Sequence, residues 1–154
     1  MYTNYPQDVE VVTPFGLVYL AITDGYHVYV NANSNGRTVT IGGKPIRFTA
    51  HLKFRDGHWA EDKDSAGRYS LYARKANVNT INDEATDTQK SKIRDVVFPA
   101  IIQFLNDRPE LLKQAQSIHV NNRIDSLQEE VDKLQLQLNE KLQEMNTLRL
   151  SCTN

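Results

Sequence analysis

The last third of the chain constrains the fold most, because it has neither glycine nor proline from Glu110 to Leu150. Apolar residues recur there at alternating spacings of three and four, a pattern typical of coiled coils. About 40 helical residues extend about 60 Å at 1.5 Å per residue, which is longer than a domain of this size. We therefore predict that the helix pairs with another chain, with a homodimer as the default and a higher homo-oligomer as the alternative. The predicted oligomerisation residues are Ile124, Leu127, Val131, Leu134, Leu138, Met145 and Leu148, and Lys141 occupies a position where another apolar residue is due.

The first half of the chain has the pattern of an antiparallel sheet. Short runs rich in Val, Ile, Tyr, Phe and Thr alternate with clusters of Gly, Pro, Asn and Asp, which mark turns. The Asp24-Gly25 pair is a strong hairpin signal, because its residues tolerate the positive φ of tight turns. We predict six short strands over residues 8–13, 17–22, 26–31, 37–41, 46–55 and 69–74, with a polar loop over 56–68.

The strand over 46–55 alternates most clearly between apolar and polar residues. Ile46, Phe48, Ala50, Leu52 and Phe54 share one face, which we expect to be the core. The opposite face offers several cations that alternate residues would project side by side, so it is a second candidate for anion binding. A solvated strand face is the alternative interpretation. The residues of this candidate are Arg47, His51, Lys53 and Arg55.

The second half changes to helical spacing. Thr86 and Gln89 form a capping-box pattern that predicts a helix start, and an apolar stripe from Ile93 to Phe104 would cover the sheet. Pro99 lies within this stripe and should kink the helix. A stop and a new start over 106–110 imply a helical hairpin or a sharp bend. The predicted fold is therefore α+β, with a sheet and covering helix over 1–106 and an oligomerisation helix over 107–154.

Composition and motifs exclude several functions. The 18 Lys and Arg residues nearly balance the 19 Asp and Glu residues, so attraction to nucleic acid or to an anionic membrane is not expected. The only cysteine is Cys152, which rules out a disulfide framework and favours the cytoplasm, and no secretion signal or membrane span is predicted. No catalytic or phosphate-cradling motif is present, so we expect neither an enzyme nor a cofactor. Only His58 with nearby acids suggests a metal, and we favour solvated surface there.

Two further segments are candidates for binding. Residues 74–80, which begin at Arg74, are basic and amide-rich and lie between sheet and helix, although a plain polar connector is equally consistent. Residues 119–123 place Asn121 and Asn122 in the middle of a helix, where asparagine is a poor former. Poor helix formers inside a helix, without a visible structural gain, often mark a functional site. The alternative is a surface patch of weak helix propensity.

The order of elements resembles a group of bacteriophage proteins, the anti-Thoeris proteins of the first type. The resemblance covers most of the chain as architecture, together with short patterns over 46–59 and 86–105 and the spacing of Ala85, Thr86 and Ile93. Proteins of that family bind cyclic ADP-ribose-type immune signals and sequester them without cleaving them. The resemblance implies a phage anti-defence protein acting in the cytoplasm of an infected bacterium.

The resemblance also implies a ligand set near the helices of a dimer. An aromatic face would stack on the purine, asparagines would bind ribose hydroxyls, and arginines would bind the pyrophosphate. For both phenylalanines the alternative is core packing. A protein-interaction module or inhibitor that grips a host protein through the coiled coil remains the alternative function. The implied ligand residues are Arg74, Phe98, Phe104, Asn106, Asn122 and Arg123.

Overall fold

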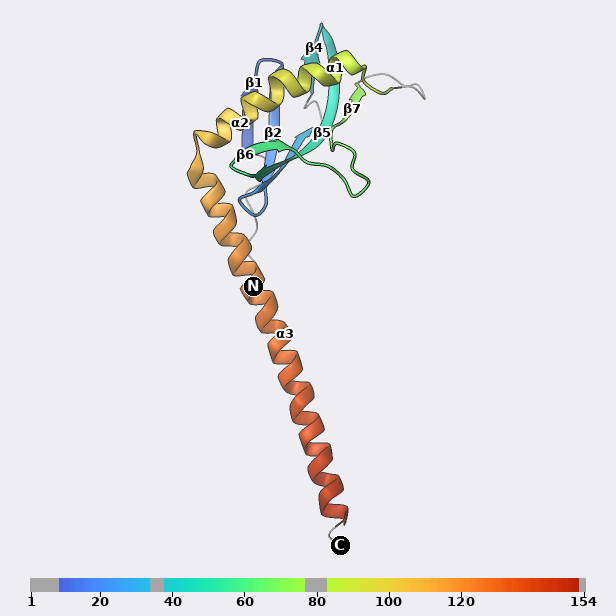
Figure 1. Cartoon of the computed structure of the whole chain (residues 1–154), viewed down its shortest axis with the longest axis vertical. Helices are drawn as coiled ribbons and strands as arrows, with labels where there is room; N and C mark the ends of the chain where they lie inside the picture. Colours follow the sequence, from blue (N-terminus) through green and yellow to red (C-terminus); the bar gives the residue numbers. More distant parts are fainter. Residues whose placement is uncertain (1–8, 34–37, 77–82, 153–154) are drawn as a thin grey trace. The chain divides into compact units, whose positions relative to one another are not determined.

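The computed structural model describes residues 9–33, 38–76 and 83–152. An antiparallel sheet of seven strands precedes a helical layer and a long C-terminal helix, which confirms the predicted α+β fold (Figure 1). The described residues divide into two compact units, one that ends at His119 and one from Val120 onward. The strands are β1 (Val9–Thr13), β2 (Gly16–Ile22), β3 (His27–Ala32), β4 (Val39–Ile41), β5 (Lys44–Arg55), β6 (His58–Glu61) and β7 (Tyr72–Lys75). The helical elements are α1 (Asp87–Lys92), the π-helical η1 (Ile93–Val97), α2 (Phe98–Asn106) and α3 (Pro109–Cys152).

The 12-residue strand β5 organises the sheet. Strands β1, β2 and β3 form an antiparallel meander that continues into β5. Ile46 of β5 is paired with Val39 of β4 on one side and with Lys75 of β7 on the other, so β4 and β7 flank opposite edges of β5. Strand β6 pairs with the last part of β5, from Leu52 to Arg55. Because β5 touches four other strands, its two faces define the two faces of the sheet.

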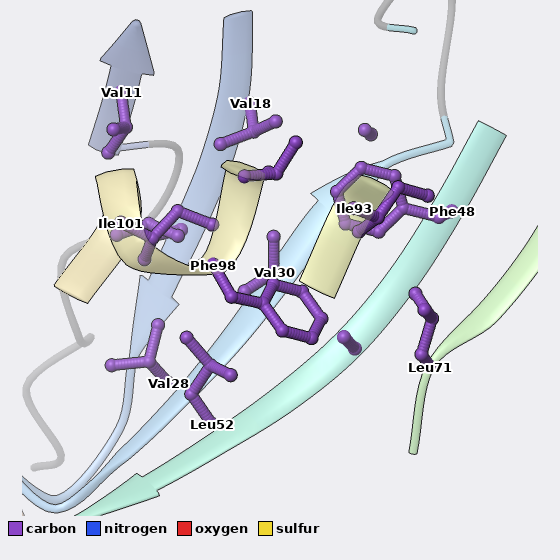
Figure 2. Packing of buried hydrophobic residues seen from close by; sticks show 14 of the residues in the cluster. Val11, Val18, Val28, Val30, Phe48, Leu52, Leu71, Ile93, Phe98 and Ile101 are labelled. Atoms are coloured by element: carbon purple, nitrogen blue, oxygen red, sulfur yellow. The ribbon is translucent and has the colours of Figure 1, made fainter. Parts of the chain in front are cut away.

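The predicted alternation in β5 is confirmed. Ile46, Phe48, Ala50 and Leu52 are buried, whereas the residues between them are partly or fully exposed. The buried face packs against the helical layer, where Ile93, Phe98 and Ile101 lie over Val30 and Phe48 (Figure 2). The sheet therefore has one face covered by α1, η1 and α2. We call the opposite one the outer face.

The helical layer starts as the sequence predicts. The Thr86 side chain accepts a hydrogen bond from the Gln89 backbone N–H, and the Gln89 side chain accepts one from the Thr86 N–H. The irregularity near Pro99 takes the form of a π-helical turn, in which the Phe98 N–H bonds to the Ile93 carbonyl, five residues back. Proline has no N–H, and its ring crowds the carbonyl four residues earlier. The wider turn directly before Pro99 fits that requirement.

Three strand predictions need correction. The predicted polar loop over 56–68 contains β6, so the sheet has seven strands and not six. Strand β7 begins at Tyr72, whereas Tyr69 makes only an isolated bridge with Lys63. Strand β4 begins at Val39, and the residues 34–37 assigned to the turn and strand start lie outside the described residues, as do residues 77–80 of the basic segment.

The predicted break between helices is confirmed, since α2 ends at Asn106 and α3 begins at Pro109. The first turns of α3 belong to the sheet-containing unit: Ala115 is fully buried, and Leu111 and Leu112 pack against the core. A helix that is long and apolar enough to cross a membrane does not occur among the residues described.

Candidate functional site

The predicted oligomerisation residues lie on α3, an uninterrupted helix of 44 residues. Their side chains are open to solvent in the single chain, with exposed fractions from 41% for Leu127 to 63% for Leu134. A soluble helix usually hides such a stripe against a partner. We call this set the seam. It consists of Ile124, Leu127, Val131, Leu134, Leu138, Met145 and Leu148.

Lys141 occupies the seam position between Leu138 and Met145, as the spacing predicts. Its ammonium group lies 3.8 Å from the Glu144 carboxylate, and both side chains are largely exposed. The pair is therefore a surface ion pair of small energetic weight. Lys141 interrupts the seam chemically but not structurally, because the helix runs through it without a break.

A second candidate is an open depression of about 630 Å³ where β6 and the Tyr69 segment meet the helical layer. Its lining combines several apolar side chains with a few polar ones. Depressions that combine an apolar surface with a few placed polar groups are the usual form of small-molecule sites. The lining residues are Leu52, Ala60, Glu61, Lys63, Tyr69, Arg94, Phe98, Pro99 and Ile102.

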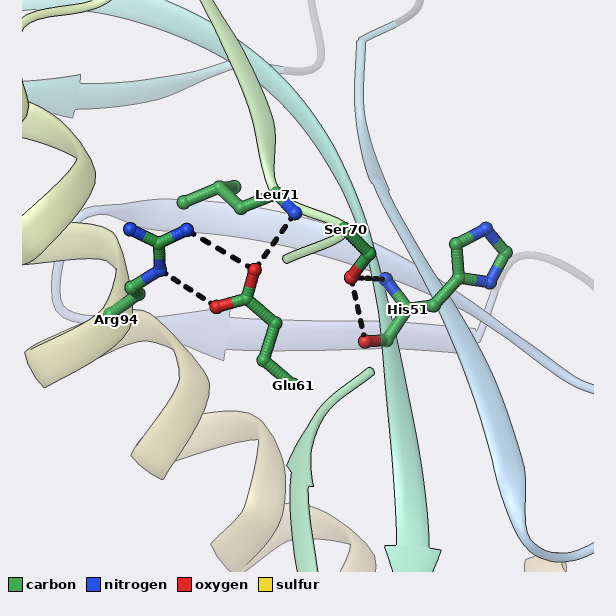
Figure 3. Close-up of polar contacts among 5 residues, drawn as sticks. All are labelled: His51, Glu61, Ser70, Leu71 and Arg94. Carbon is green, nitrogen blue, oxygen red and sulfur yellow. Dashed lines mark hydrogen bonds and ion pairs between the residues drawn. The ribbon is translucent and has the colours of Figure 1, made fainter. Parts of the chain in front are cut away.

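Two of the polar lining residues form an ion pair. Arg94 of η1 donates to Glu61 of β6 through Nε at 2.7 Å and Nη2 at 3.2 Å. The same carboxylate accepts from the Leu71 backbone N–H at 2.8 Å, so it is held from both sides (Figure 3). The Glu61 side chain is largely buried. Its hydrogen bonds raise the pKa of the Arg94 guanidinium above the usual value, so Arg94 keeps its charge.

Tyr69 brings an aromatic ring close to two cations. The Lys63 ammonium lies 4.9 Å from the ring centroid, and the Arg94 guanidinium carbon lies 5.5 Å from it. Tyr69 is 56% exposed, so part of the ring is open to solvent. An aromatic ring and two cations beside apolar lining residues suit a ligand that carries both a flat ring and negative charge.

Arg74 lies on the outer face, directly opposite Arg47 in the pairing of β7 with β5. Such cross-strand partners have Cβ atoms about 5 Å apart, where like charges repel. The Arg74 guanidinium makes an ion pair with Asp83 at 3.0 Å, and its carbon lies 5.6 Å from the Tyr72 ring centroid. Sequence reasoning placed these two arginines in separate candidates, and the structure brings them together.

The other members of the predicted anion set spread along the same face. From Arg47 to Arg55, β5 covers about 26 Å at 3.3 Å per residue, so the four side chains cannot meet one phosphate. His51 lies beside Tyr29, with ring centroids 4.9 Å apart. Lys53 is paired with His27 and Ala60, and Arg55 with His58. Any one phosphate could therefore meet only part of this set, and anion binding on this face stays a prediction.

Four members of the ligand set that the resemblance implies lie in the sheet-containing unit, on β7 and α2, and the set as a whole stays a prediction. Phe98 is 4% exposed and packs against Phe48, so it is a core residue that only borders the depression. Phe104 is half buried, and the Arg108 guanidinium carbon covers its ring at 4.0 Å. Asn106 is exposed at the end of α2. The remaining two residues, Asn122 and Arg123, belong to the unit that starts at Val120.

The acidic residues around His58 have other roles. Glu61 holds Arg94, and Asp64 holds Arg68 at 3.3 Å and accepts backbone hydrogen bonds that lower the pKa of its carboxyl. Among the described residues, there is no group of three or more His, Cys, Asp or Glu side chains that could hold a metal ion. The depression can bind a ligand through charge and ring stacking. Its buried carboxylate, Glu61, serves as a structural partner of Arg94.

Sequence reasoning missed the depression because its parts come from three distant segments. The Asp56-Gly57 turn was the available signal, since it predicts the hairpin that carries Glu61. Comparison of the chain with protein-family models, with curated proteins and with solved structures gives no match.

Proposed function

We propose that the chain is a non-catalytic, homo-oligomeric binding protein that captures a nucleotide signal of the cyclic ADP-ribose type. The observation that carries the proposal is the exposed seam on α3. Such a seam favours a partner helix, and a second copy of the chain supplies an identical seam. The named signal class rests on the resemblance to anti-Thoeris proteins. The depression around Tyr69 supplies chemistry that suits such a ligand.

Association through the seam is energetically reasonable. Full burial of one Leu, Ile, Val or Met side chain contributes about 1.5–3 kcal/mol. Association costs about 4–15 kcal/mol in lost freedom of motion. The seven exposed seam residues of each chain are therefore sufficient to hold two or more copies together. The same seam could instead bind a helix of a host protein, which is the alternative function.

The depression suits the two ends of a nucleotide. A purine can stack on Tyr69 or contact the apolar lining at Pro99 and Ile102, which are not fully buried. A phosphate can reach the Lys63 ammonium and the Nη1 group of Arg94, which takes part in neither hydrogen bond to Glu61. Sequestration needs only binding, so a general base is not required for this function.

Calorimetry of the full-length protein with cyclic ADP-ribose isomers tests the proposal. We expect stoichiometric binding of at least one isomer, with chromatography recovering the ligand intact. Lys63→Gln together with Tyr69→Ala should weaken binding at least tenfold, the loss of about 1.4 kcal/mol. Arg68→Gln is the matched control, because Arg68 is exposed, lies next to Tyr69 in sequence and pairs only with Asp64 among the contacts described. Absence of binding, or conversion of the ligand, contradicts the proposal.

A second experiment tests assembly. Changing Leu127, Val131 and Leu134 together to glutamine should reduce the mass measured by light scattering to that of the monomer and weaken ligand binding. Leu136→Gln is the control, since Leu136 is as exposed as the seam but lies outside its spacing. Native mass spectrometry of the purified protein separates the two functions: a homo-oligomer with a bound small molecule supports capture, and a stoichiometric host protein supports the alternative.

A further inference from the structure

The seam of α3 is not a uniform apolar stripe, because its two positions hold different residue types. In a seven-residue repeat, two positions face the partner, here called the first and second seam positions. Continuing the spacing of the seam in both directions adds Val120 at one end and Cys152 at the other. The first positions hold Ile124, Val131, Leu138, Met145 and Cys152, and the second positions hold Val120, Leu127, Leu134, Lys141 and Leu148.

The residue types at these positions favour two strands over three or four. Ile124 and Val131 put β-branched side chains at the first position, and Leu127 and Leu134 put leucine at the second. In parallel coiled coils this combination favours dimers, because it fits the two different packing geometries of a two-stranded seam. The N-terminal part of the seam carries this preference most clearly, since Lys141 interrupts the second position later on.

Charges beside the seam favour the parallel orientation. Glu144 and Arg149 flank the seam on opposite sides, five residues apart. In a parallel, in-register pair, a residue at the position of Glu144 faces the partner's residue five positions later, so each glutamate would meet an arginine. Both copies of this contact form at once by symmetry. In an antiparallel pair, the position type of Glu144 faces the same type in the partner, and so does that of Arg149. The attraction between glutamate and arginine is then lost.

We propose that two copies of α3 pair in parallel and in register, so that each seam residue meets its own counterpart. This inference rests on the self-association proposed above and adds the orientation and the number of chains. It places the two Cys152 thiols against each other at the last first-position layer. It also connects both sheet-containing units to the same end of the coiled coil.

Disulfide trapping in the full-length protein reads the orientation. Diamide accepts two electrons and two protons from two thiols, which leaves an S–S bond. We expect wild-type protein to form a covalent dimer through Cys152 at low micromolar concentration, and Cys152→Ser to form none. The matched control is Cys152→Ser with Gln143→Cys, since Gln143 lies on the side of the helix away from the seam. Its covalent dimer should form at least about ten times more slowly, because those thiols point apart.

Val120→Cys in the wild-type background separates the orientations. A parallel pair gives 120–120 and 152–152 linked peptides in mass spectrometry, whereas an antiparallel pair gives 120–152 links. Analytical ultracentrifugation of the reduced protein supplies the mass. A monomer would overturn the self-association of the proposed function. A dimer with 120–152 links, or a reduced mass above that of two chains, would overturn only this further inference.

Discussion

Arg94 and Glu61 lie 33 residues apart in sequence, yet the guanidinium holds both oxygens of the carboxylate at 2.7 and 3.2 Å. This contact connects the helical layer to β6, the strand that forms a hairpin with the end of β5. It also fixes Arg94 beside Tyr69, so the fold and the candidate ligand site depend on the same pair.

Removing Arg94 should destabilise the protein. Arg94→Ala leaves the largely buried Glu61 carboxylate with only the Leu71 N–H as a hydrogen-bond donor among the contacts described, so we expect the free energy of unfolding to fall by about 2 kcal/mol. Arg94→Lys keeps the charge but loses the two-pronged contact and should cost less. Urea denaturation at fixed protein concentration measures both. The surface pair of Lys90 and Glu84 is the control.

Glu84→Gln removes an ion pair whose carboxylate is mostly exposed, so its cost should stay below about 0.5 kcal/mol. Equal losses for Arg94→Ala and Glu84→Gln would mean that burial of Glu61 has no energetic consequence.

Gly25 should not tolerate a side chain. Its φ is +86°, and a Cβ there would lie 2.8 Å from the Leu112 carbonyl oxygen of α3 and 2.9 Å from the Gln116 Cβ. Gly25→Ala should therefore lower the free energy of unfolding by about 2 kcal/mol or more, through backbone strain and overlap together. Gly43→Ala isolates the strain, because Gly43 has a φ of +76° and no atom within 4 Å of the added Cβ.

Gly43→Ala should cost about 1 kcal/mol. Thermal melts of the two variants, recorded side by side, measure the difference. If the two losses agree, the β2–β3 turn does not pack closely on α3.

Sequence patterns predicted the features of the fold that depend on residues close together in the chain. The alternation from Ile46 to Phe54 fixed which face of β5 is buried, and the capping box at Thr86 fixed the helix start, because each depends on residues close in sequence. The strand β6 escaped prediction since His58–Glu61 holds only four residues and one large apolar side chain, Trp59. Its turn at Asp56 and Gly57 has positive φ values of 55° and 82°, as in other tight hairpins.

The candidate ligand site was beyond such patterns. Arg94 and Glu61 meet only after the sheet and helix have packed, and nothing in the spacing of either residue indicates the other. Phe98 shows the opposite limit. Its position on an apolar stripe fits stacking on a ligand and packing in a core equally well, and burial against Phe48 is what distinguishes the two.

The stability of the β2–β3 turn should depend on pH through Asp24. Burial alone would raise the pKa of this carboxyl, but hydrogen bonds from the Tyr26 N–H and the His27 ring outweigh it, so the pKa lies below its usual value. A carboxyl with a lowered folded-state pKa stabilises the fold above its unfolded pKa of about 4. That stability is lost as the pH falls through the folded-state value.

Asp24→Asn removes the charge and keeps a residue that tight turns accept. The difference in free energy of unfolding between wild type and variant should therefore shrink as the pH falls below about pH 4. Urea denaturation at a series of pH values measures it. A difference that stays constant down to pH 2 would contradict the role assigned to the Asp24 charge.

Lys141 limits the strength of the proposed coiled coil. It holds a seam position, where its charge must stay hydrated instead of packing. Lys141→Leu should bury one more leucine in each copy, each contributing about 1.5–3 kcal/mol, so the dissociation constant of the oligomer should fall at least tenfold. Circular dichroism melts at several protein concentrations measure the change. Lys133→Leu is the matched control, since Lys133 is equally a surface lysine of α3 but lies off the seam.

The same substitution tests what Lys141 contributes to specificity. A single polar residue in a seam fixes the number and alignment of chains at the expense of stability. Lys141→Leu should therefore allow species larger than a dimer, visible as a second boundary in ultracentrifugation, while Lys133→Leu should keep one species. A tighter oligomer with an unchanged chain count would restrict the role of Lys141 to weakening the assembly, and no gain over Lys133→Leu would place Lys141 outside the contact between chains.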